Sequence, residues 1–378
     1  MINPCCETCG GCNYRNLDVA SYRKLKTENF NKTLEKIKKS DFKVNPPIFI
    51  SDGTRRRATF AFEYRQKKLI FGFNQKADNK LVDLTECYSL TEKINKNINF
   101  IRELMTAICS QPYNEKQGKK IIQKTISKGD VFVCEADNGL DVVLEFSAPL
   151  TLDYRMIVSE MINENSDIIR ISHRHSQFSS SETIVVKTTP FIKSGEYKIL
   201  IPAGTFLQPS AEGQKTLENL VKKYVKNSAC HIADLFCGVG TFSYLFANQR
   251  NTKITAIDSS ASLLKGFNDS LNVNQITNIK IVNKNLFKYP LDENELKEFD
   301  VVIFDPPRAG AKELCRAIAK SENQPESIIA ISCNPQTFVN DAETLISGGY
   351  KLEEVTMIDQ FPYSNHSELV AFFTKNKN

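Results

Sequence analysis

The sequence predicts an α/β protein in two parts: a mostly antiparallel α+β domain over residues 1–205 and a doubly wound parallel sheet over residues 206–378. Its 378 residues suffice for two or three domains. From about residue 211 onward, helical and strand patterns alternate, which is typical of parallel sheets. Before that point, hairpin signals join the strand patterns, and Asp137-Asn138-Gly139 is the strongest of them.

Charge separates the two parts as well. Residues 1–200 carry 31 Lys and Arg against 24 Asp and Glu, a balance of +7, whereas residues 201–378 carry 18 against 20, a balance of −2. A basic surplus confined to one half is typical of a domain that contacts a polyanion. Solvated lysines on helix faces are the alternative explanation.

Location and cysteine use are linked. The chain has no run of 18 apolar residues, and its first residues, Met1-Ile2-Asn3-Pro4, do not form a signal peptide. We therefore expect a cytoplasmic protein without a membrane partner. Because the cytosol is reducing, its eleven cysteines are expected to be metal ligands, catalytic residues or core residues rather than disulfides.

Four cysteines lie within eight residues at positions 5, 6, 9 and 12. The glycines between Cys9 and Cys12 let two thiolates face one centre, and Cys87 can complete the set from a distance. This spacing predicts a metal site but fits zinc and an iron–sulfur cluster equally. A redox Cys-x-x-Cys pair is the alternative.

The predicted first domain begins with an amphipathic helix over residues 17–39, which carries apolar residues at helical spacing. Two β-rich runs follow, at 55–64 and 69–73, and are expected to pair antiparallel. Arginines and aromatics interleave there, a mixture that contacts phosphates and bases, although basic edge strands show it too. Further elements are a helix at 91–111 and strands near 131–134, 142–146, 168–172, 183–188 and 197–201.

The predicted second domain carries a cofactor signature at its first strand-to-helix turn. The loop 234–242 contains Gly238-Val239-Gly240, and Asp258 ends the next strand, where a carboxylate accepts ribose hydroxyls. Asn285, after the third strand, is placed to meet an adenine. Because Asp234 would repel a diphosphate, a cationic nucleoside such as S-adenosylmethionine fits better. The expected elements are a helix at 211–227 and strands near 231–236, 253–258, 279–283, 299–305, 328–332, 352–359 and 369–374.

Reactive side chains follow the later strands. Asp305-Pro306-Pro307-Arg308 closes the fourth strand with a rigid carboxylate, and Cys333 closes the fifth. Glu368 precedes the last strand, which we expect to run antiparallel. Its start would then share an edge with the ends of the parallel strands, so a nucleophile, a base and a cofactor would meet in one crevice.

These motifs together resemble the RNA uracil-C5 methyltransferases that use S-adenosylmethionine, over nearly the whole chain. Among them the chain is most similar to the branch that acts on bacterial 23S ribosomal RNA and carries a [4Fe–4S] cluster. The resemblance implies a class I Rossmann-like methyltransferase domain at 206–378, preceded by a cluster-bearing, RNA-binding domain at 1–205. The matching stretches are Cys-Gly-Gly-Cys at 9–12, Arg-Arg-Arg-Ala at 55–58, Val-Asp-x-x-x-Cys at 82–87, Phe-x-Gln-Pro at 206–209, the loop 234–242, Asp-Pro-Pro-Arg at 305–308, Ser-Cys-Asn at 332–334 and His-x-Glu at 366–368.

Roles follow from the resemblance. Cys333 would be the nucleophile and Glu368 the base. The substrate would be RNA, with 23S rRNA favoured over tRNA, and DNA is not expected to bind. The enzyme is expected to be a monomer. The implied cluster ligands are Cys5, Cys9, Cys12 and Cys87, and the implied cofactor or active-site contacts are Gln208, Phe236, Thr241, Asp258, Asn285 and Asp305.

The chain departs from the family pattern at three places. The spacing before Cys9 leaves open whether Cys5 or Cys6 is the first cluster ligand, and Ser210 and Thr241 each stand where relatives often have Asn. Two other functions stay open. An RNA cytosine-C5 methyltransferase would carry a further cysteine after the fourth strand, and a non-catalytic RNA-binding protein would be expected to lose Cys333 or Glu368.

Overall fold

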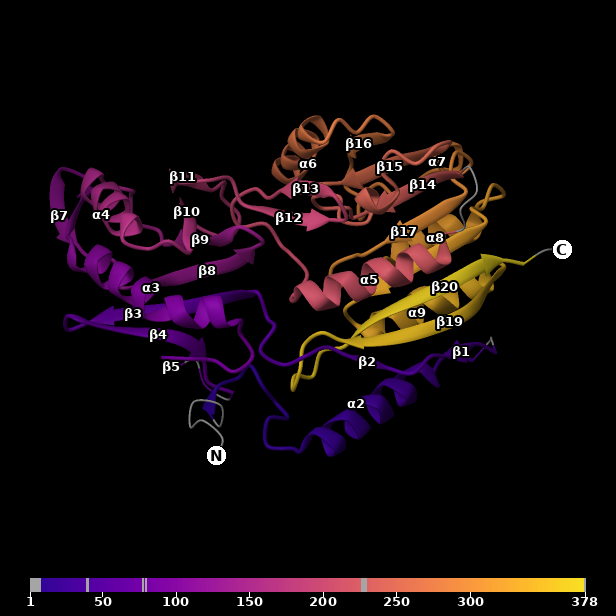
Figure 1. Ribbon diagram of the computed structural model, residues 1–378, viewed down its shortest axis with the longest axis horizontal. Helices are drawn as coiled ribbons and strands as arrows, with labels where there is room; N and C mark the ends of the chain where they lie inside the picture. The colour runs from indigo at the N-terminus through magenta and orange to yellow at the C-terminus, as the bar shows by residue number, and fades with distance from the viewer. Residues whose placement is uncertain (1–7, 39–40, 77, 79, 226–229, 377–378) are drawn as a thin grey trace. The chain divides into compact units, whose positions relative to one another are not determined.

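The computed structural model describes residues 8–38, 41–76, 78, 80–225 and 230–376 (Figure 1). The chain forms two compact units. The first unit contains Asp52–Ile192 and Ile201–Ser210 together with the N-terminal residues up to Asn16. The second contains Leu17–Ser51, Lys193–Leu200 and the chain from Ala211 onward.

The second unit is built on a nine-stranded sheet. Its main path runs β1-β19-β20-β18-β17-β14-β15-β16, with β2 also paired to β19. Every pairing is parallel except those of β20, which runs antiparallel to both β18 and β19. This confirms the doubly wound order and the direction of the last strand. The strands are β1 (Lys43–Val44), β2 (Ile48–Phe49), β14 (Cys230–Leu235), β15 (Thr252–Asp258), β16 (Ile279–Asn283), β17 (Val301–Phe304), β18 (Ser327–Ser332), β19 (Tyr350–Asp359) and β20 (Glu368–Lys375).

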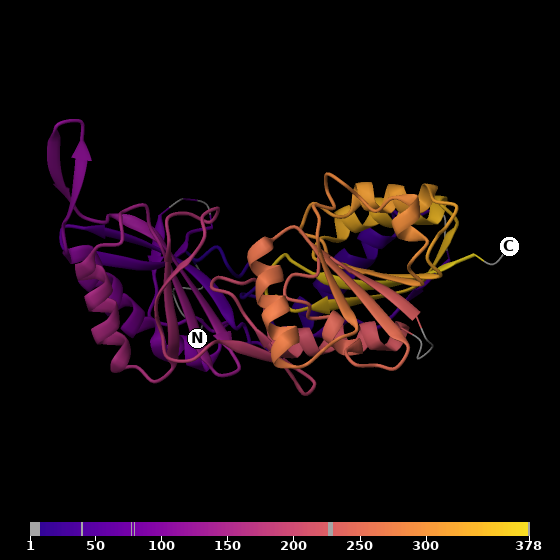
Figure 2. The same ribbon diagram turned by 90° about the horizontal axis from the view of Figure 1, so that it is seen from above.

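Helices cover both faces of this sheet (Figure 2). Apolar residues of α2, α8 and α9 share one core with the sheet. Side-chain caps fix several helix starts, as where Asp18 accepts from the Ser21 N–H and Asn334 from the Gln336 N–H. The helices are α2 (Val19–Leu34), α5 (Ala211–Tyr224), α6 (Ala261–Val273), α7 (Glu293–Leu296), α8 (Lys312–Lys320) and α9 (Pro335–Ser347), with a 3₁₀ turn at Ser243–Phe246.

The first unit is built on a seven-stranded sheet in the order β11-β10-β9-β8-β3-β4-β5, antiparallel except at β9–β10. This confirms both predicted hairpins. Helices α3 (Glu92–Ser110) and α4 (Leu152–Asn163) pack on it. The strands are β3 (Arg57–Arg65), β4 (Lys68–Asn74), β5 (Leu81–Asp83), β8 (Lys128–Ala136), β9 (Gly139–Glu145), β10 (Ile168–Arg174) and β11 (Glu182–Val186).

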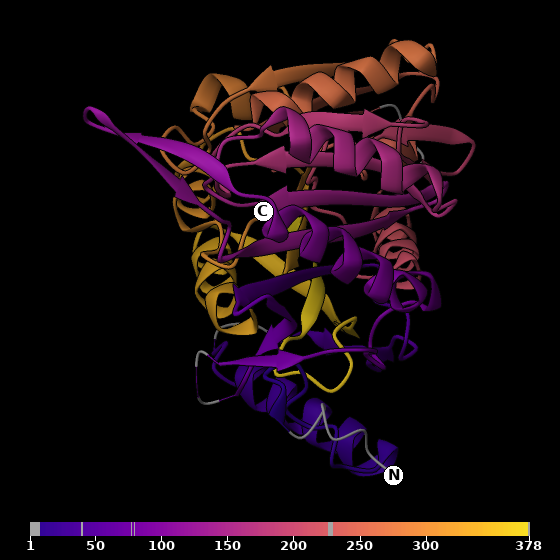
Figure 3. The same cartoon turned by 90° about the vertical axis from the view of Figure 1, so that its left-hand side faces the viewer.

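Two further pairs stand apart from these sheets. Strands β6 (Tyr113–Gln117) and β7 (Lys120–Lys124) form a two-stranded hairpin that projects from its own unit (Figure 3). Strands β12 (Phe191–Ser194) and β13 (Tyr197–Leu200) form another, where the chain passes from the first unit to the second. The sequence patterns did not predict β6, β7, β12 or α4.

The division into units differs from the predicted boundary between residues 205 and 206 at three places: Leu17–Ser51 and Lys193–Leu200 lie in the second unit, and residues 206–210 lie in the first. Residues 17–39 were expected to belong with the first domain, but α2 lies in the second unit. The cause is its buried face. Phe30 and Leu34 join the core of the nine-stranded sheet, and Lys26 forms a buried ion pair with Asp359. Within the described part of the chain, no helix combines the length and apolarity needed to cross a membrane.

Candidate active site

The predicted site residues of the second unit gather at one edge of its sheet. Parallel register brings the ends of β14, β15 and β17 together, so Leu235, Asp258 and Asp305 lie at the same edge. The antiparallel pairing of β20 with β18 brings Leu369 opposite Ser332. Carboxyl ends of parallel strands are where open α/β sheets bind ligands.

Backbone geometry shapes the loop after β14. Gly238 and Gly240 have φ of +57° and +84°, a region that glycine adopts without strain. A Cβ on Gly240 would also lie 2.0 Å from the ring of Phe267, so no larger residue fits there. Phe236 has φ of +59°, which holds an aromatic ring in a conformation that is rare outside glycine. Together these residues fix the backbone conformation of the loop that follows β14.

Three carboxylates make this edge strongly acidic. Asp234 is buried and accepts hydrogen bonds from the Ser243 N–H at 3.0 Å and its hydroxyl at 2.5 Å. Burial, with a smaller contribution from the charges of Asp305 and Asp258, raises the pKa of Asp234 to about 7, although the hydrogen bonds from Ser243 oppose the rise. The carboxylates of Asp305 and Asp258 are therefore close enough to Asp234 to repel its charge. A cationic ligand would relieve that repulsion.

The side chains of Asp258 and Asn285 already bind backbone groups. Asp258 accepts from the N–H groups of Gly238 at 3.0 Å and Ser260 at 2.8 Å. The side-chain amide oxygen of Asn285, Oδ1, accepts from the N–H groups of Phe287 and Lys288, at 3.1 Å each. These bonds orient both side chains, and each Asp258 oxygen keeps a second lone pair for a ligand. Thr241 is half-buried in the glycine loop.

Phe236, which directly follows β14, forms an aromatic pair with Phe287. The rings of Phe236 and Phe287 lie 5.2 Å apart, tilted by 50°, and the Phe287 side chain is 48% exposed. Such a surface suits a flat base. The sequence analysis did not single out Phe287. The pair joins segments about fifty residues apart, so no local pattern signals it.

Cys333 lies in the short connection between β18 and α9. It directly follows Ser332, the last residue of β18, and precedes Asn334, the N-cap of α9, which begins at Pro335. Burial, together with the negative charges of Glu368 and Asp305, raises the pKa of the Cys333 thiol to about 11, although the charge of Arg308 opposes the rise. The helix N-terminus favours a thiolate. The thiol thus lies within electrostatic reach of both carboxylates.

Glu368 is buried at the first position of β20. The side-chain amide of Gln360 donates to its carboxylate at 2.8 Å. In the same region the guanidinium of Arg308 donates to Nε2 of His366 at 3.1 Å, which links the Asp-Pro-Pro-Arg and His-x-Glu motifs. Sequence reasoning missed Gln360, since a glutamine at the end of a strand carries no distinctive signal.

Gln208 belongs to the first unit, in contrast to the other predicted cofactor residues. There its backbone carbonyl accepts from Arg56 Nε at 2.9 Å, and the Arg57 guanidinium lies 3.8 Å from the centre of the Phe206 ring. The Arg-Arg-Arg-Ala and Phe-x-Gln-Pro motifs therefore pack on each other, although about 150 residues separate them. A contact of Gln208 with the cofactor remains a prediction.

The predicted metal ligands lie partly outside the described residues. Cys5 and Cys6 are not described, whereas Cys9, Cys12 and Cys87 lie in the first unit, the first two buried and the third half-buried. Nowhere in the described ranges do three potential ligands stand close enough together to hold a metal ion. The Cys-ligated site therefore remains a prediction.

The guanidinium of Arg55 nevertheless lies within electrostatic reach of all three described thiols. Burial lowers the pKa of the Arg55 guanidinium, and the charges of Cys87, Cys12 and Cys9 raise it. Cys9 Sγ also accepts from the Gly11 N–H at 3.4 Å. Each of the three sulfurs therefore interacts electrostatically with Arg55.

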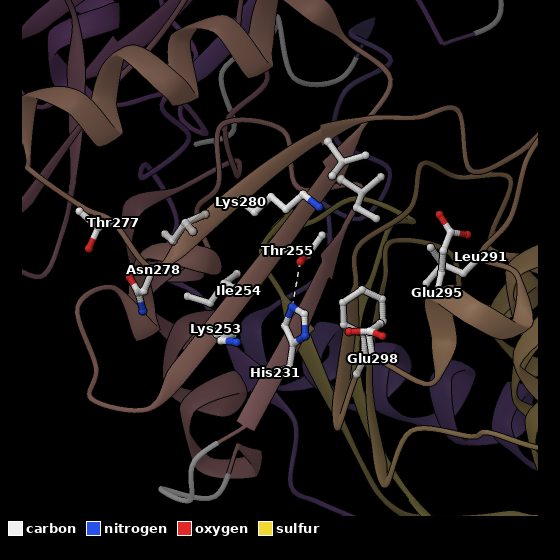
Figure 4. A pocket seen from close by; sticks show the side chains of 14 residues that line it. His231, Lys253, Ile254, Thr255, Thr277, Asn278, Lys280, Leu291, Glu295 and Glu298 are labelled. Atoms are coloured by element: carbon white, nitrogen blue, oxygen red, sulfur yellow. Dashed lines mark hydrogen bonds between the residues drawn. The ribbon is translucent and has the colours of Figure 1, made fainter.

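A groove of about 580 Å³ lies elsewhere on the second unit (Figure 4). The start of β14, much of β15 and β16 and the segment around α7 line it. At its wall, His231 Nε2 and the Thr255 hydroxyl lie 2.9 Å apart (Figure 4). None of the predicted site residues is among those that line the groove.

The strand order, the antiparallel last strand and the glycine loop are those of an α/β methyltransferase. The family model described as tRNA (Uracil-5-)-methyltransferase matches residues 21–376. The chain therefore belongs to this family and is an RNA methyltransferase, which confirms the resemblance seen in the sequence.

Individual relatives agree with this assignment. An uncharacterized RNA methyltransferase of Brucella melitensis is 33% identical over 99% of this chain and 85% of its own. The 23S rRNA (uracil(1939)-C(5))-methyltransferase RlmD of Vibrio parahaemolyticus is 27% identical over 99% and 82%. The crystal structure of the Pyrococcus abyssi tRNA (uracil-54, C5)-methyltransferase in complex with S-adenosyl-L-homocysteine shares the fold, with a TM-score of 0.73, 22% identity and coverage of 96% and 86%.

Proposed function

We propose that the protein transfers a methyl group from S-adenosylmethionine to C5 of a uridine in RNA through a covalent adduct on Cys333. The observation that carries the proposal is the electrostatic interaction between the Cys333 thiol, which directly follows β18, and the buried carboxylate of Glu368, which begins the paired strand β20. Cys333 would supply the nucleophile and Glu368 the base.

Each residue has one part in the mechanism. Uracil C5 is a weak nucleophile, so the Cys333 thiolate adds to C6 and moves the ring electrons towards C5 and O4. S-adenosylmethionine, when bound, supplies the electrophilic methyl group. Glu368 then removes the C5 proton, the C5–C6 double bond re-forms, and the C6–S bond breaks to release the thiolate. The target base must leave its stack to reach the thiol.

The acidic edge supports a cationic methyl donor. The charges of Asp258 and Asp305 disfavour ionisation of Asp234, and a bound sulfonium would offset that repulsion. Phe236, Thr241, Asp258 and Asn285 would bind the nucleoside part. Gln208 and Asp305 would hold the polar edge of the uracil or fix the cofactor.

The favoured substrate is 23S rRNA, as in the Vibrio parahaemolyticus relative, and tRNA is the alternative, as in the Pyrococcus abyssi protein. The basic balance of residues 1–200 supports a polyanionic partner for a monomeric enzyme. Mapping 5-methyluridine in rRNA and tRNA from a deletion strain tests this. Loss from 23S rRNA alone would support the favoured substrate, and loss from tRNA alone would replace it.

We further propose a [4Fe–4S] cluster held by Cys9, Cys12, Cys87 and either Cys5 or Cys6. The electrostatic interaction of three sulfurs with Arg55 supports it, because a cation offsets thiolate charge. When bound, the cluster would link the N-terminal segment covalently to the loop that follows β5, which contains Cys87. Anaerobically purified protein should be brown and contain about four irons per chain, whereas a colourless protein loaded with zinc would reject the cluster.

A further inference from the structure

A buried polar network joins α2 to the segment that leads into Glu368. Tyr22, Lys26 and Asp359 are 4%, 3% and 1% exposed. The Lys26 ammonium lies 3.1 Å from one oxygen of Asp359, and the Tyr22 hydroxyl donates to the other oxygen. More than 330 residues separate the partners, so only the fold brings them together.

The same two side chains hold the loop before Glu368. Lys26 donates to the backbone carbonyls of Ser364, at 3.0 Å, and His366. The Tyr363 N–H donates to the Tyr22 hydroxyl at 2.8 Å, and the two tyrosine rings stack 4.6 Å apart. Tyr363 has φ of +60°, a strained conformation for a side-chain-bearing residue, which persists when its surroundings fix it.

The network also reaches the carboxylate itself. Asp359 ends β19, and the next residue, Gln360, donates its side-chain amide to Glu368 at 2.8 Å. Glu368 in turn pairs with Ile358 across the two strands. The loop is therefore fixed on both sides of the turn: by α2 at Asp359 and at the carbonyls of residues 364 and 366.

Packing alone does not account for these residues. Phe30 and Leu34 already anchor α2 in the core. Burying an ammonium and a carboxylate costs desolvation that apolar residues of similar size avoid. The described bonds of the Lys26 ammonium go to Asp359 and to the two loop carbonyls, all within the segment that positions Glu368.

We infer that Lys26 and Tyr22 are positioning residues for proton abstraction: they fix the loop 363–367 so that the Glu368 carboxylate faces the C5 proton of the adduct. The inference rests on the proposed function, in which Glu368 is that base. It makes α2 a part of the catalytic unit, in addition to an element of its core.

The test compares Tyr22→Phe and Lys26→Met with Lys24→Met, whose side chain is 77% exposed on the same helix. Undermodified RNA from a deletion strain is the substrate. Loosening the loop should slow proton removal but spare the attack by Cys333. We expect kcat to fall about tenfold for Tyr22→Phe and about a hundredfold for Lys26→Met, with KM for RNA changed less than threefold. Lys24→Met should match the wild type.

A second readout separates positioning from loss of structure. If proton removal becomes limiting, methylated adduct should accumulate as a protein–RNA band that survives denaturing gel electrophoresis, as expected for Glu368→Gln. Tyr22→Phe keeps the stacked ring and loses only a hydroxyl, so it tests the inference even if Lys26→Met does not fold.

The outcomes are distinguishable. The inference is overturned if Tyr22→Phe keeps kcat within twofold of the wild type, or if it loses activity without accumulating adduct while Glu368→Gln does accumulate it. If Glu368→Gln itself forms no adduct, the proposed function fails, and the inference with it.

Discussion

Replacing Glu368 with Gln should lower the pKa of the Cys333 thiol, because the charge of Glu368 is one cause of its rise to about 11. Cys333 and Glu368 adjoin the paired residues Ser332 and Leu369, so we take their separation as about 5 Å, the value for opposed side chains on antiparallel strands. At an effective dielectric constant of about 20, two unit charges at that distance interact by roughly 3 kcal/mol. Since Cys333 is half-buried and salt screens the pair, we expect about half of this, or about one pKa unit.

The assay is alkylation of Cys333 by iodoacetamide without RNA, followed for its own peptide by mass spectrometry between pH 7 and 10. A pKa lower by one unit gives about tenfold more thiolate at pH 8. Each thiolate becomes about threefold less nucleophilic, so alkylation should be roughly threefold faster. Glu353→Gln is the matched control, because Glu353 accepts from Thr374 near the other end of the sheet. An unchanged or raised thiol pKa in Glu368→Gln would refute the electrostatic account.

Three further predictions concern the same unit. Because the Cys333 pKa is about 11, kcat/KM for RNA should rise about tenfold per pH unit from pH 7 to 9; a profile that is flat or falls there would show that the thiolate is not limiting. The pKa of Asp234 is raised to about 7 in the folded state, so the folded protein binds a proton there more tightly than the unfolded chain does. The stability that this proton provides is fully present below about pH 4 and is lost as the pH rises through 7. Asp234→Asn should therefore increase the free energy of unfolding in urea at pH 8 by up to about 4 kcal/mol and change it little at pH 4, and equal effects at both pH values would contradict this assignment. Gly240→Ala places a Cβ 2.0 Å from Phe267 at φ +84°, so it should destabilise the protein by about 3 kcal/mol or more and weaken binding of S-adenosylmethionine in calorimetry, whereas unchanged stability would show that the loop is not rigid.

The sequence predicted the second unit well because its strands are continuous apolar runs separated by amphipathic helices. All seven strands expected after residue 230 are present, and the antiparallel last strand follows from a short connection before Glu368. Glycine, proline and acidic residues at strand ends marked the edge correctly. The roles of Cys333 and Glu368 there remain to be tested.

Long-range contacts were less accessible. Lys26 and Tyr22 of α2 contact Asp359. The sequence did not predict this placement, because nothing in it distinguishes a buried lysine from an exposed one. Strands β1 and β2 have two residues each, too few for a periodic pattern. The hairpin β6–β7 is mostly exposed, with Ile121 at 72%, so no alternation marked it.

Release of tritium from RNA labelled at uracil C5 tests the central claim most directly, because only chemistry at that carbon frees the label. With S-adenosylmethionine, the wild-type protein should release tritium in step with formation of 5-methyluridine, and Cys333→Ala should release none. Methylation by the Cys333→Ala protein, or methyl transfer without tritium release, would contradict the account.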